Sequence, residues 1–452
     1  MTQQATRSTI FVWGNNAFGK LGVGDVSADI GPTQLPIALP SKCVAVAASG
    51  RSSAALVESG ELYVWGDICQ GARTLCPASL RSLCVSPSPP PHLAQLRAHS
   101  AAWSLASDQS GTTGVLRHAP QRVMLPARTQ VRAIALGRAH VMALAATGQL
   151  YTWGMGLDGR LGHGDAVHRD GPTLVSALED AGVALMSIAA GTAHSIAADA
   201  EGTLWTWGCG LEGSLGLDES DDSVLTPTRV ETATLAPSER PDGAGRQVRM
   251  LAAGNQSSMA VTVDGRLFTW GLGAHYALGL GNMETVRKPT EVQTLRYAKI
   301  KKAAVGPRHA AAVGEDGVLY TWGSGAHGRL GHGDNNATHR LPTPVSFFEG
   351  RKVFDVSICH CDGCGTAAIT EDGACFTWGA AHGALGNDHD KRVPEEGADD
   401  EGGEEFDAAP SHQLVPRSVE GSWHRDKQTK IDAIALGSYH ALLLTSAKVE
   451  RR

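Results

Sequence analysis

The sequence predicts an all-β protein, a seven-bladed β-propeller built from four-stranded antiparallel blades. Two observations carry this prediction. The dipeptide Trp-Gly recurs seven times, each time at the end of a β-rich run, and most of these runs follow a Gly-x-x-His turn and a tight hairpin. Glycine is also abundant, with 54 residues among 452, about 12% against a usual ~7%. Such a glycine content without a collagen period indicates many tight turns and therefore many short strands.

Each repeat predicts one blade. An inner strand leads to a Gly-x-x-His turn such as Gly306–His309, and a second strand leads to a hairpin such as Asp316-Gly317. Asp-Gly suits a hairpin because glycine adopts positive φ without strain. A third strand ends in Trp-Gly, a GxLGxGD loop such as Gly328–Asp334 follows, and an outer strand completes the unit. Because one blade exposes both its faces, blades of roughly 52 residues must stack on one another.

Two sets of residues recur once per blade, and we expect both to be structural. The tryptophans should fill the space between blades, with each indole N–H bonded to backbone; they are Trp13, Trp65, Trp153, Trp207, Trp270, Trp322 and Trp378. Trp103 and Trp423 stand outside the repeat, so we expect their replacement to cost much less stability. The turn histidines should bond locally to backbone and fix each turn; they are His140, His194, His309 and His440. Ser52, Ser257 and Gly365 replace histidine in the other three turns, which argues against a shared metal.

The two ends of the chain predict how the ring closes. Residues 431–446 supply two strands of a blade, and residues 8–40 supply the other two, so both ends should share one blade. We therefore expect a single domain over residues 1–452. Its repeats are expected at about 8–40 with 431–446, 41–128, 129–178, 183–231, 247–295, 299–347 and 352–420.

The repeat resembles that of the regulator of chromosome condensation family over nearly the whole chain. The resemblance lies in the repeat length of roughly 52 residues and in the motifs Gly-x-x-His, Trp-Gly and GxLGxGD. The resemblance implies the seven-bladed fold. It also implies the activity best known in that family, guanine-nucleotide exchange on a small Ran-like GTPase. Exchange there uses a wedge that projects from one blade, and the loops Met155–Asp165 and Cys209–Asp218 look too ordinary to form it. The similar plant ultraviolet-B photoreceptor carries tryptophans after the turn glycine, and this chain has none there.

Two insertions break the repeat. Residues 68–118 lack the GxLGxGD loop, contain Ser86-Pro-Ser-Pro-Pro-Pro91, and read either as a surface insertion or as a partner-binding arm that carries Trp103. Residues 388–407 hold ten carboxylates against two basic residues. Such a block repels itself, so it reads as a solvated spacer or as a docking surface for a basic partner.

Motifs that suggest chemistry are weak. Cys359, Cys361 and Cys364, with a histidine between them, are weak candidate zinc ligands, since structural zinc takes four sulfur or nitrogen ligands. Their spacing is C-x-C-x-x-C rather than two separated C-x-x-C pairs, so we favour a widened turn with free thiols. Gly154–Gly159 fits the dinucleotide fingerprint but recurs with the blade period and opens no helix of a βαβ unit. We expect no catalytic residue, cofactor or metal.

These observations favour a non-enzymatic protein–protein interaction scaffold, with guanine-nucleotide exchange on a Ran-like GTPase as the alternative. Loops on a rigid ring can carry function that the fold does not specify. Residues of the kinds that anchor interfaces stand in the turns and in the first insertion; they are Arg51, Arg138, Arg308, Tyr439 and Trp103. Partners should be other proteins, including a small GTPase on the alternative reading, and the oligomeric state is left open.

Net charge constrains the partners further. At −7, with a pI near 6.2, the chain is a poor match for nucleic acid. No apolar run is long enough to insert in a membrane. Nine cysteines without a secretory signal fit a reducing compartment. We therefore expect a cytoplasmic protein, with a nuclear or a cytoskeleton- or cilium-associated location also compatible.

Overall fold

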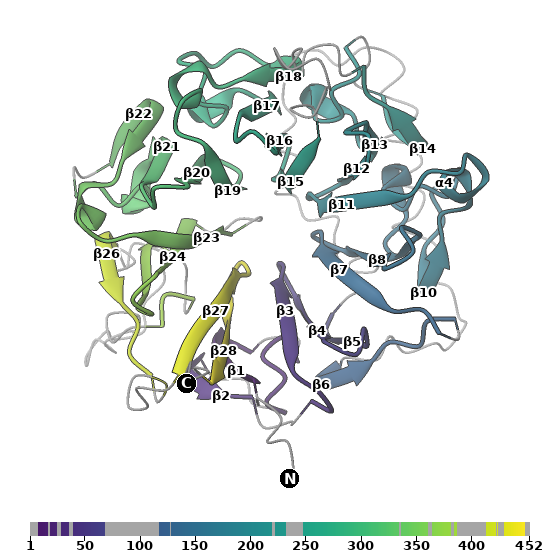
Figure 1. The fold of residues 1–452 in the computed structure, drawn as a ribbon, viewed down its shortest axis with the longest axis horizontal. Coiled ribbons are helices and arrows are strands. Elements are labelled where there is room, and N and C mark those ends of the chain that lie inside the picture. The colour runs from purple at the N-terminus through teal and green to yellow at the C-terminus, as the bar shows by residue number, and fades with distance from the viewer. Residues whose placement is uncertain are drawn as a thin grey trace, which may run out of the picture.

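Seven four-stranded sheets stand around a central axis in the computed structural model of this chain, which confirms the predicted seven-bladed β-propeller (Figure 1). The structure describes residues 8–16, 19–24, 29–35, 39–67, 117–126, 128–218, 222–231, 247–333, 336–359, 364–380, 384–386, 413–421, 423 and 429–447.

Blade 6 shows how one repeat folds. Its sheet runs outward from β19 (Ile300–Val305) through β20 (His309–Gly314) and β21 (Leu319–Gly325) to β22 (Asn336–Pro344). β20 reads HAAAVG and is buried along its whole length, as expected of a short apolar run bounded by turns. Gly317 closes the hairpin after β20 at φ +88°, where a Cβ would also lie only 2.7 Å from the Cβ of Lys352. Glycine is therefore required there by conformation and by space.

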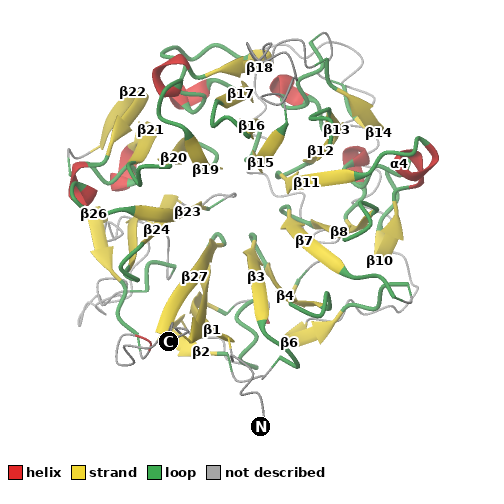
Figure 2. Ribbon diagram, viewed as in Figure 1, coloured by secondary structure: helices red, strands yellow, loops and turns green. Residues whose placement is uncertain are grey.

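Blades 2 to 5 and blade 7 repeat this order, and the ribbon shows them almost free of helix apart from α4 (Ser176–Asp180) and short 3₁₀ turns (Figure 2). The strands are β3 (Cys43–Ala48), β4 (Ser52–Val57), β5 (Leu62–Gly66) and β6 (Arg117–Arg122) in blade 2; β7 (Val131–Leu136), β8 (His140–Ala145), β9 (Leu150–Gly154) and β10 (Arg169–Leu174) in blade 3; β11 (Leu185–Ala190), β12 (His194–Asp199), β13 (Leu204–Gly208) and β14 (Val224–Arg229) in blade 4; β15 (Val248–Ala253), β16 (Ser257–Thr262), β17 (Leu267–Gly271) and β18 (Val286–Glu291) in blade 5; and β23 (Val353–Ile358), β24 (Cys364–Thr370), β25 (Cys375–Ala380) and β26 (Gln413–Ser418) in blade 7.

Blade 1 closes the ring with strands from both ends of the chain, as the sequence predicted. Its order is β2-β1-β28-β27, with β1 (Ser8–Asn15) and β2 (Asp29–Gln34) from one end and β27 (Thr429–Leu436) and β28 (His440–Ala447) from the other. β1 pairs with β28 in unbroken register from Ser8 opposite Ser446 to Gly14 opposite His440. The ring is therefore closed by an ordinary antiparallel strand pair.

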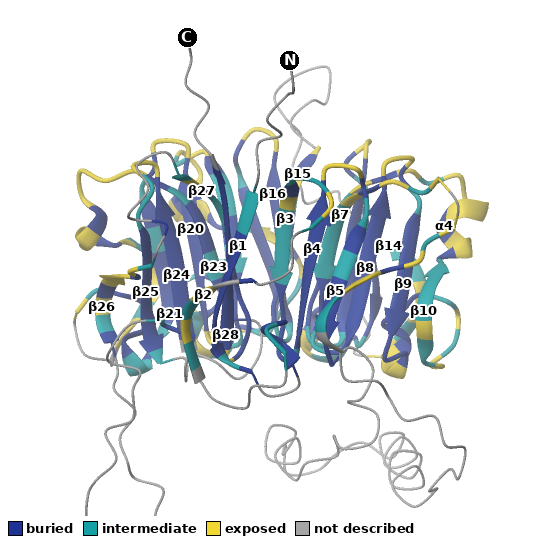
Figure 3. Cartoon of the chain, turned by 90° about the horizontal axis from the view of Figure 1, so that it is seen from below, coloured by how far each residue is buried: buried dark blue, intermediate teal, exposed yellow. Residues whose placement is uncertain are grey.

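The hydrophobic core lies between neighbouring blades. Seven of the eight core clusters among the described residues draw on two adjacent sheets, as where Met142 and Leu144 of blade 3 pack with Trp207 of blade 4. Six of the seven blade tryptophans are fully buried, and Trp153 is 3% exposed. In the side view, burial fills the strands while exposed residues lie mainly at the two ends of the blades (Figure 3). The inner strands leave a central cavity of about 220 Å³ lined by small and branched apolar side chains.

Two expectations change. The first insertion was expected to reach residue 118, but β6 begins at Arg117, because that residue already pairs with Gly66. Trp423 was expected to stand outside the core, yet it is 4% exposed and packs with Trp13 at 6.2 Å and Phe11 at 4.7 Å between ring centroids. Among the described residues, no helix is long and apolar enough to cross a membrane.

Candidate functional site

One end of the ring carries both the Gly-x-x-His turns and the Trp-Gly loops, and we call it the turn face. In blade 6, His309 pairs with Gly323, so the turn before β20 lies beside the end of β21. The backbone N–H of Ser324 then donates to the carbonyl oxygen of Arg308 at 2.9 Å. Equivalent bonds join turn and loop in the first five blades as well, so every such pair lies on one face. The opposite end, with the tight hairpins, is the hairpin face.

Both insertions leave and rejoin the ring at the turn face. β5 ends at Gly66 and β6 begins opposite it at Arg117. β25 passes Gly379, which pairs with Gln413 at the start of β26. Residues 68–116 and 387–412 lie outside the described residues, so Trp103 and the acidic block are placed only through these flanking residues. The turn face is therefore the end of the propeller that departs most from a plain repeat.

The turn histidines contact the next blade, which corrects the expectation that they bond locally to backbone. His140 Nε2 lies 3.0 Å from the Ser195 hydroxyl, and that hydroxyl donates to the Arg160 carbonyl oxygen at 2.9 Å. Trp207 Nε1 donates to the same oxygen at 3.0 Å. Histidine and carbonyl belong to blade 3, hydroxyl and indole to blade 4. We call the set of histidine, hydroxyl and carbonyl a histidine latch.

Four junctions between blades carry a complete latch. The other three are His440 with Ser53 at 2.8 Å, His194 with Ser258 at 3.0 Å, and His309 with Thr366 at 2.8 Å. Each hydroxyl donates to a loop carbonyl of the histidine's blade; the acceptors are Lys20, Ser214 and Arg329. Sequence reasoning missed these hydroxyls, although a signal exists: hydroxyls follow only blades with histidine. The blades after Ser52, Ser257 and Gly365 carry Val141, Ala310 and Ala441 instead.

The hydrogen bonds of the latch show which ring nitrogen of each histidine carries the hydrogen. A hydroxyl has a single hydrogen, and in the latch that hydrogen goes to the loop carbonyl, so Nε2 must donate to the hydroxyl oxygen. Burial, reinforced by the positive charge of Arg160, lowers the pKa of His194 to about 4 and that of His140 well below its usual value. Burial likewise lowers the pKa of His309 and His440. All four imidazoles are thus neutral at neutral pH and already committed to the fold.

The tryptophan expectation is confirmed for six blades. Their indole N–H groups donate to backbone carbonyls of the preceding blade at 2.8 to 3.0 Å; the donors are Trp13, Trp65, Trp207, Trp270, Trp322 and Trp378. For Trp153 the corresponding loop belongs to residues 68–116, outside the described part of the chain. The junction between blades 2 and 3 also lacks a latch, because Ser52 and Val141 stand at the histidine and hydroxyl positions.

Four Trp-Gly loops hold a charged or imidazole side chain in the left-handed region. Asp158, Glu212, His275 and His327 occupy equivalent positions at φ 57–62°. Such φ values are uncommon for residues other than glycine and often mark functional loops. Asp158, Glu212 and His275 are exposed and His327 is half-buried, so blades 3 and 4 present carboxylates where blades 5 and 6 present imidazoles.

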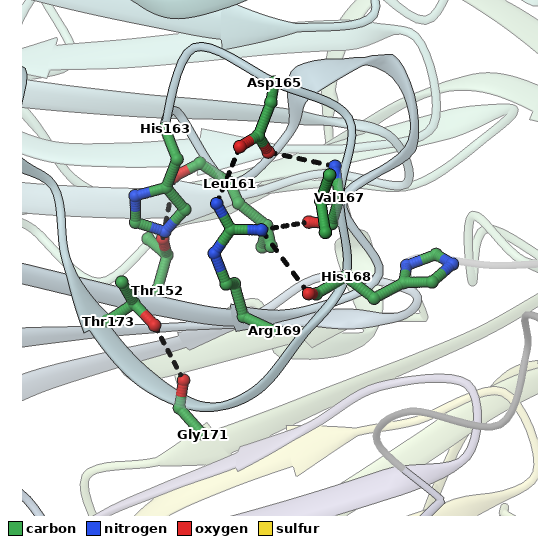
Figure 4. Close-up of polar contacts among 9 residues, drawn as sticks. All are labelled: Thr152, Leu161, His163, Asp165, Val167, His168, Arg169, Gly171 and Thr173. Atoms are coloured by element: carbon green, nitrogen blue, oxygen red, sulfur yellow. Dashed lines mark hydrogen bonds and ion pairs between the residues drawn. The ribbon is translucent and has the colours of Figure 1, made fainter. Parts of the chain in front are cut away.

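The loop of blade 3 shows how these loops keep their shape (Figure 4). Asp165 pairs with Arg169 at 2.7 Å and also accepts from the Val167 N–H at 2.9 Å. His163 Nε2 lies 3.0 Å from the Thr152 hydroxyl, which donates to the Leu161 carbonyl oxygen at 2.7 Å. The hydrogen bond from Arg169 lowers the pKa of Asp165, and burial lowers that of His163. The loop is thus held by its own polar groups.

The four predicted interaction residues of the turns lie on this face, in different surroundings. Arg51 is paired with the buried carboxylate of Asp67 at 3.5 Å. Tyr439 is 36% exposed and lies 5.0 Å below the Lys20 ammonium, measured to the ring centre. Arg138 is half-buried and Arg308 is exposed. The structure therefore distributes them around the ring instead of gathering them into one cluster.

The structure describes the side chain of only one of the three cysteines that were weak candidates for zinc ligands. Cys359 is buried and not in a disulfide. Cys361 and the side chain of Cys364 lie outside the described residues. No group of three metal-ligating side chains occurs among the residues described. The zinc reading thus stays a weak prediction.

Comparison with known proteins gives a consistent family. The RCC1-like domain model matches residues 9–398. Human E3 ubiquitin-protein ligase HERC2 is 32% identical over 361 residues, 79% of this chain but 6% of HERC2. The Arabidopsis thaliana ultraviolet-B receptor UVR8 is 36% identical over 272 residues, 60% of this chain and 58% of the receptor. The chain therefore spans less than two thirds of either relative.

Solved structures agree on the fold. Saccharomyces cerevisiae Prp20p, studied with its binding properties to Gsp1p and histones, has a TM-score of 0.71 at 18% identity, over 98% of this chain and 92% of Prp20p. Human WBSCR16 has a TM-score of 0.68 at 20% identity, over 98% of this chain and 100% of WBSCR16. At such identities the likeness supports the shared propeller architecture alone.

Proposed function

This chain belongs to the RCC1-like domain family, and from that premise we propose that it is a non-enzymatic scaffold that binds partner proteins through its turn face. One observation carries the proposal. The groups that look catalytic, the turn histidines, are buried, neutral and bonded across blade junctions, while exposed charged side chains stand out from the loops around them. A rigid ring with varied loops suits binding, because little conformational entropy is lost when a partner docks.

The two insertions support the same face. Both break the repeat, and both are anchored at the turn face through Gly66 with Arg117 and Gly379 with Gln413. Long irregular segments in compact domains are often functional. The insertion at residues 68–116 therefore serves as the binding arm in this proposal, with the acidic block at 388–407 contributing.

Site-specific crosslinking tests the choice of face. A photo-crosslinking amino acid replaces Tyr439 on the turn face or, as the matched control, Tyr297, which is 90% exposed in the link before β19 on the hairpin face. Adducts with partner proteins should form from position 439 and be absent from position 297. Adducts from position 297 alone would contradict the proposal.

Excision tests the insertion. Residues 68–114 are replaced by a short Gly-Ser linker, which keeps β6 intact because that strand begins at Arg117. The propeller should still fold, and partners that depend on the arm should be lost. Unchanged partner recovery by a folded excision variant would remove the arm from the proposal.

Guanine-nucleotide exchange on a Ran-like GTPase is the second candidate. The observation that favours it is the combination of carboxylates (Asp158, Glu212) and an imidazole (His275) on neighbouring loops of one face. An exchange factor accelerates GDP release and is itself displaced by GTP, because nucleotide and factor are linked through the GTPase. Measured acceleration of GDP release from such a GTPase, retained after excision, would reverse the ranking.

A further inference from the structure

The loops of blades 3 and 6 are near copies that differ in charge. Both read GRLGHGD, at Gly159–Asp165 and Gly328–Asp334, and a His-Arg pair follows each after two residues in blade 3 and four in blade 6. Both blades also carry an arginine in the preceding turn, Arg138 and Arg308. At the left-handed position before the shared glycine, however, blade 3 has Asp158 and blade 6 has His327. Blade 3 and blade 6 therefore show how the charge of this loop differs with and without a carboxylate at that position.

Blade 3 balances its positive charges. Arg160 pairs with Asp158 at 2.8 Å, and Arg169 pairs with Asp165 at 2.7 Å. Each guanidinium of this loop therefore has a carboxylate within hydrogen-bonding distance. Little unbalanced charge remains there to attract a ligand.

The described residues of blade 6 do not balance their charges in the same way, and Asp334, the counterpart of Asp165, lies outside them. Arg308 is exposed and makes no ion pair with any residue that the structure describes. Arg340 is exposed, and its guanidinium carbon lies 5.2 Å from the ring centre of Tyr276 in the blade 5 loop. In the strand register its blade 3 counterpart is Asp170, because His339 pairs with Gly323 as Arg169 pairs with Gly154. The charged group of Arg340 thus lies over an aromatic ring, and no carboxylate pairs with it among the residues that the structure describes.

The blade 5 loop adds an imidazole at the same place. The turn that holds it, Ala274–Tyr276, contacts β21 and β22 of blade 6. Burial and the nearby positive charges of Arg308 and Arg329 lower the pKa of His275. Although lowered in the free protein, this imidazole can gain a proton when a carboxylate approaches, because an opposite charge favours its charged form.

We propose that the blade 5–6 sector of the turn face, formed by His275, Tyr276, Arg308 and Arg340, binds an acidic segment of a partner protein. The inference rests on the proposed function, since it names the partner chemistry for part of the same face. Charge complementarity selects the occupant: guanidinium groups bind carboxylates through paired hydrogen bonds. The chain as a whole carries −7, so an extended polyanion such as nucleic acid would be repelled beyond this sector, whereas a short acidic segment would fit within it.

Fluorescence anisotropy with a labelled peptide of alternating glutamate and serine tests the proposal on the full chain. The test variant is Arg308→Glu with Arg340→Glu, and the matched control is Arg138→Glu with Arg169→Glu in blade 3. Reversal in blade 6 should weaken binding by roughly tenfold or more, and the affinity should fall with added salt. Reversal in blade 3 should change the affinity by less than about threefold. All variants should keep the wild-type melting temperature within a few degrees.

Several results would overturn the proposal. Equal losses in both variants would show a nonspecific charge effect. Binding of the phosphoserine version but not of the glutamate peptide, or tighter binding of a single-stranded oligonucleotide, would assign the sector to phosphate. Peptide binding that appears only after residues 388–407 are neutralised would assign it to the chain's own acidic block. If the peptide fails to bind while Tyr439 crosslinks persist, this inference fails and the proposed function stands; if both fail, the proposed function fails too.

Discussion

The junction between blades 4 and 5 and the junction between blades 5 and 6 are built on the same plan but differ by one latch. At both, a tryptophan indole donates to a loop carbonyl of the preceding blade, Trp270 to Ser214 and Trp322 to Ala277. Only the first adds an imidazole, His194, bonded to Ser258. The second has Ser257 and Ala310 at those positions. The tryptophan contact is therefore common to both junctions, whereas histidine and hydroxyl occur together or not at all.

The recurrence of these histidines can be explained by contacts between blades, and no bound ligand is needed to account for it. A shared metal site would require all the imidazoles to point to one place, whereas each is bonded to its own hydroxyl in the next blade. Loss of either partner leaves a buried donor or acceptor unsatisfied, which costs more than the bond itself contributes. Joint absence at three junctions avoids that cost.

The largest effect is expected from breaking a junction completely. Deleting residues 1–40 removes β1 and β2, two of the four strands of blade 1, together with Trp13 and the Lys20 carbonyl that accepts from Trp65. β28 would become an exposed sheet edge, a template for aggregation. We expect insoluble protein or a large drop in melting temperature. A soluble truncation with an unchanged melt would contradict the closure of the ring by both ends.

Removing one tryptophan tests the contact that the junctions share. Trp270→Ala should leave a cavity and lower the free energy of unfolding by ~3–5 kcal/mol. Trp423→Ala should cost a similar amount, because Trp423 is buried against Trp13 and Phe11. Trp103→Ala, in the insertion, should cost much less. Denaturant unfolding measures the free energy of unfolding of all three variants. A loss for Trp423→Ala as small as that for Trp103→Ala would contradict the assignment of Trp423 to the core.

Acid should weaken the latched junctions. The folded pKa of His194 is about 4 while its usual value is near 6.5, so the unfolded chain binds more protons between these values. The stability contributed by neutral His194 is complete above pH 6.5 and declines as the pH falls toward 4, by up to about 1.4 kcal/mol per pH unit. Thermal melts of wild type and His194→Ala across this range should converge on acidification. Parallel curves would mean that His194 titrates normally in the fold.

The fold could be predicted in full because its signal is periodic. Trp-Gly, the turn and the hairpin recur at blade spacing, and the two half-units at the chain ends predict one shared blade. The latch could not be placed from local reasoning, since His140 and Ser195 are separated by 55 positions and meet only when blades stack. The hydroxyl pattern was nevertheless present in the sequence. Trp423 was misplaced because it lies outside the repeat, and the charge difference between Asp158 and His327 matters only once the loops are known to share one face.

A double-mutant cycle at His194 and Ser258 tests whether the turn histidines hold neighbouring blades together and serve no ligand. Each single alanine variant should lower the free energy of unfolding by about 1–3 kcal/mol, and the two should couple by about 1–2 kcal/mol. Ser257→Ala, at the junction without a latch, should cost less than either latch variant, because the facing residue of the next blade is Ala310 and offers no hydrogen bond. Folded His194→Ala should still give partner crosslinks from position 439. Additive losses, or crosslinks abolished in a variant of near wild-type stability, would contradict the claim.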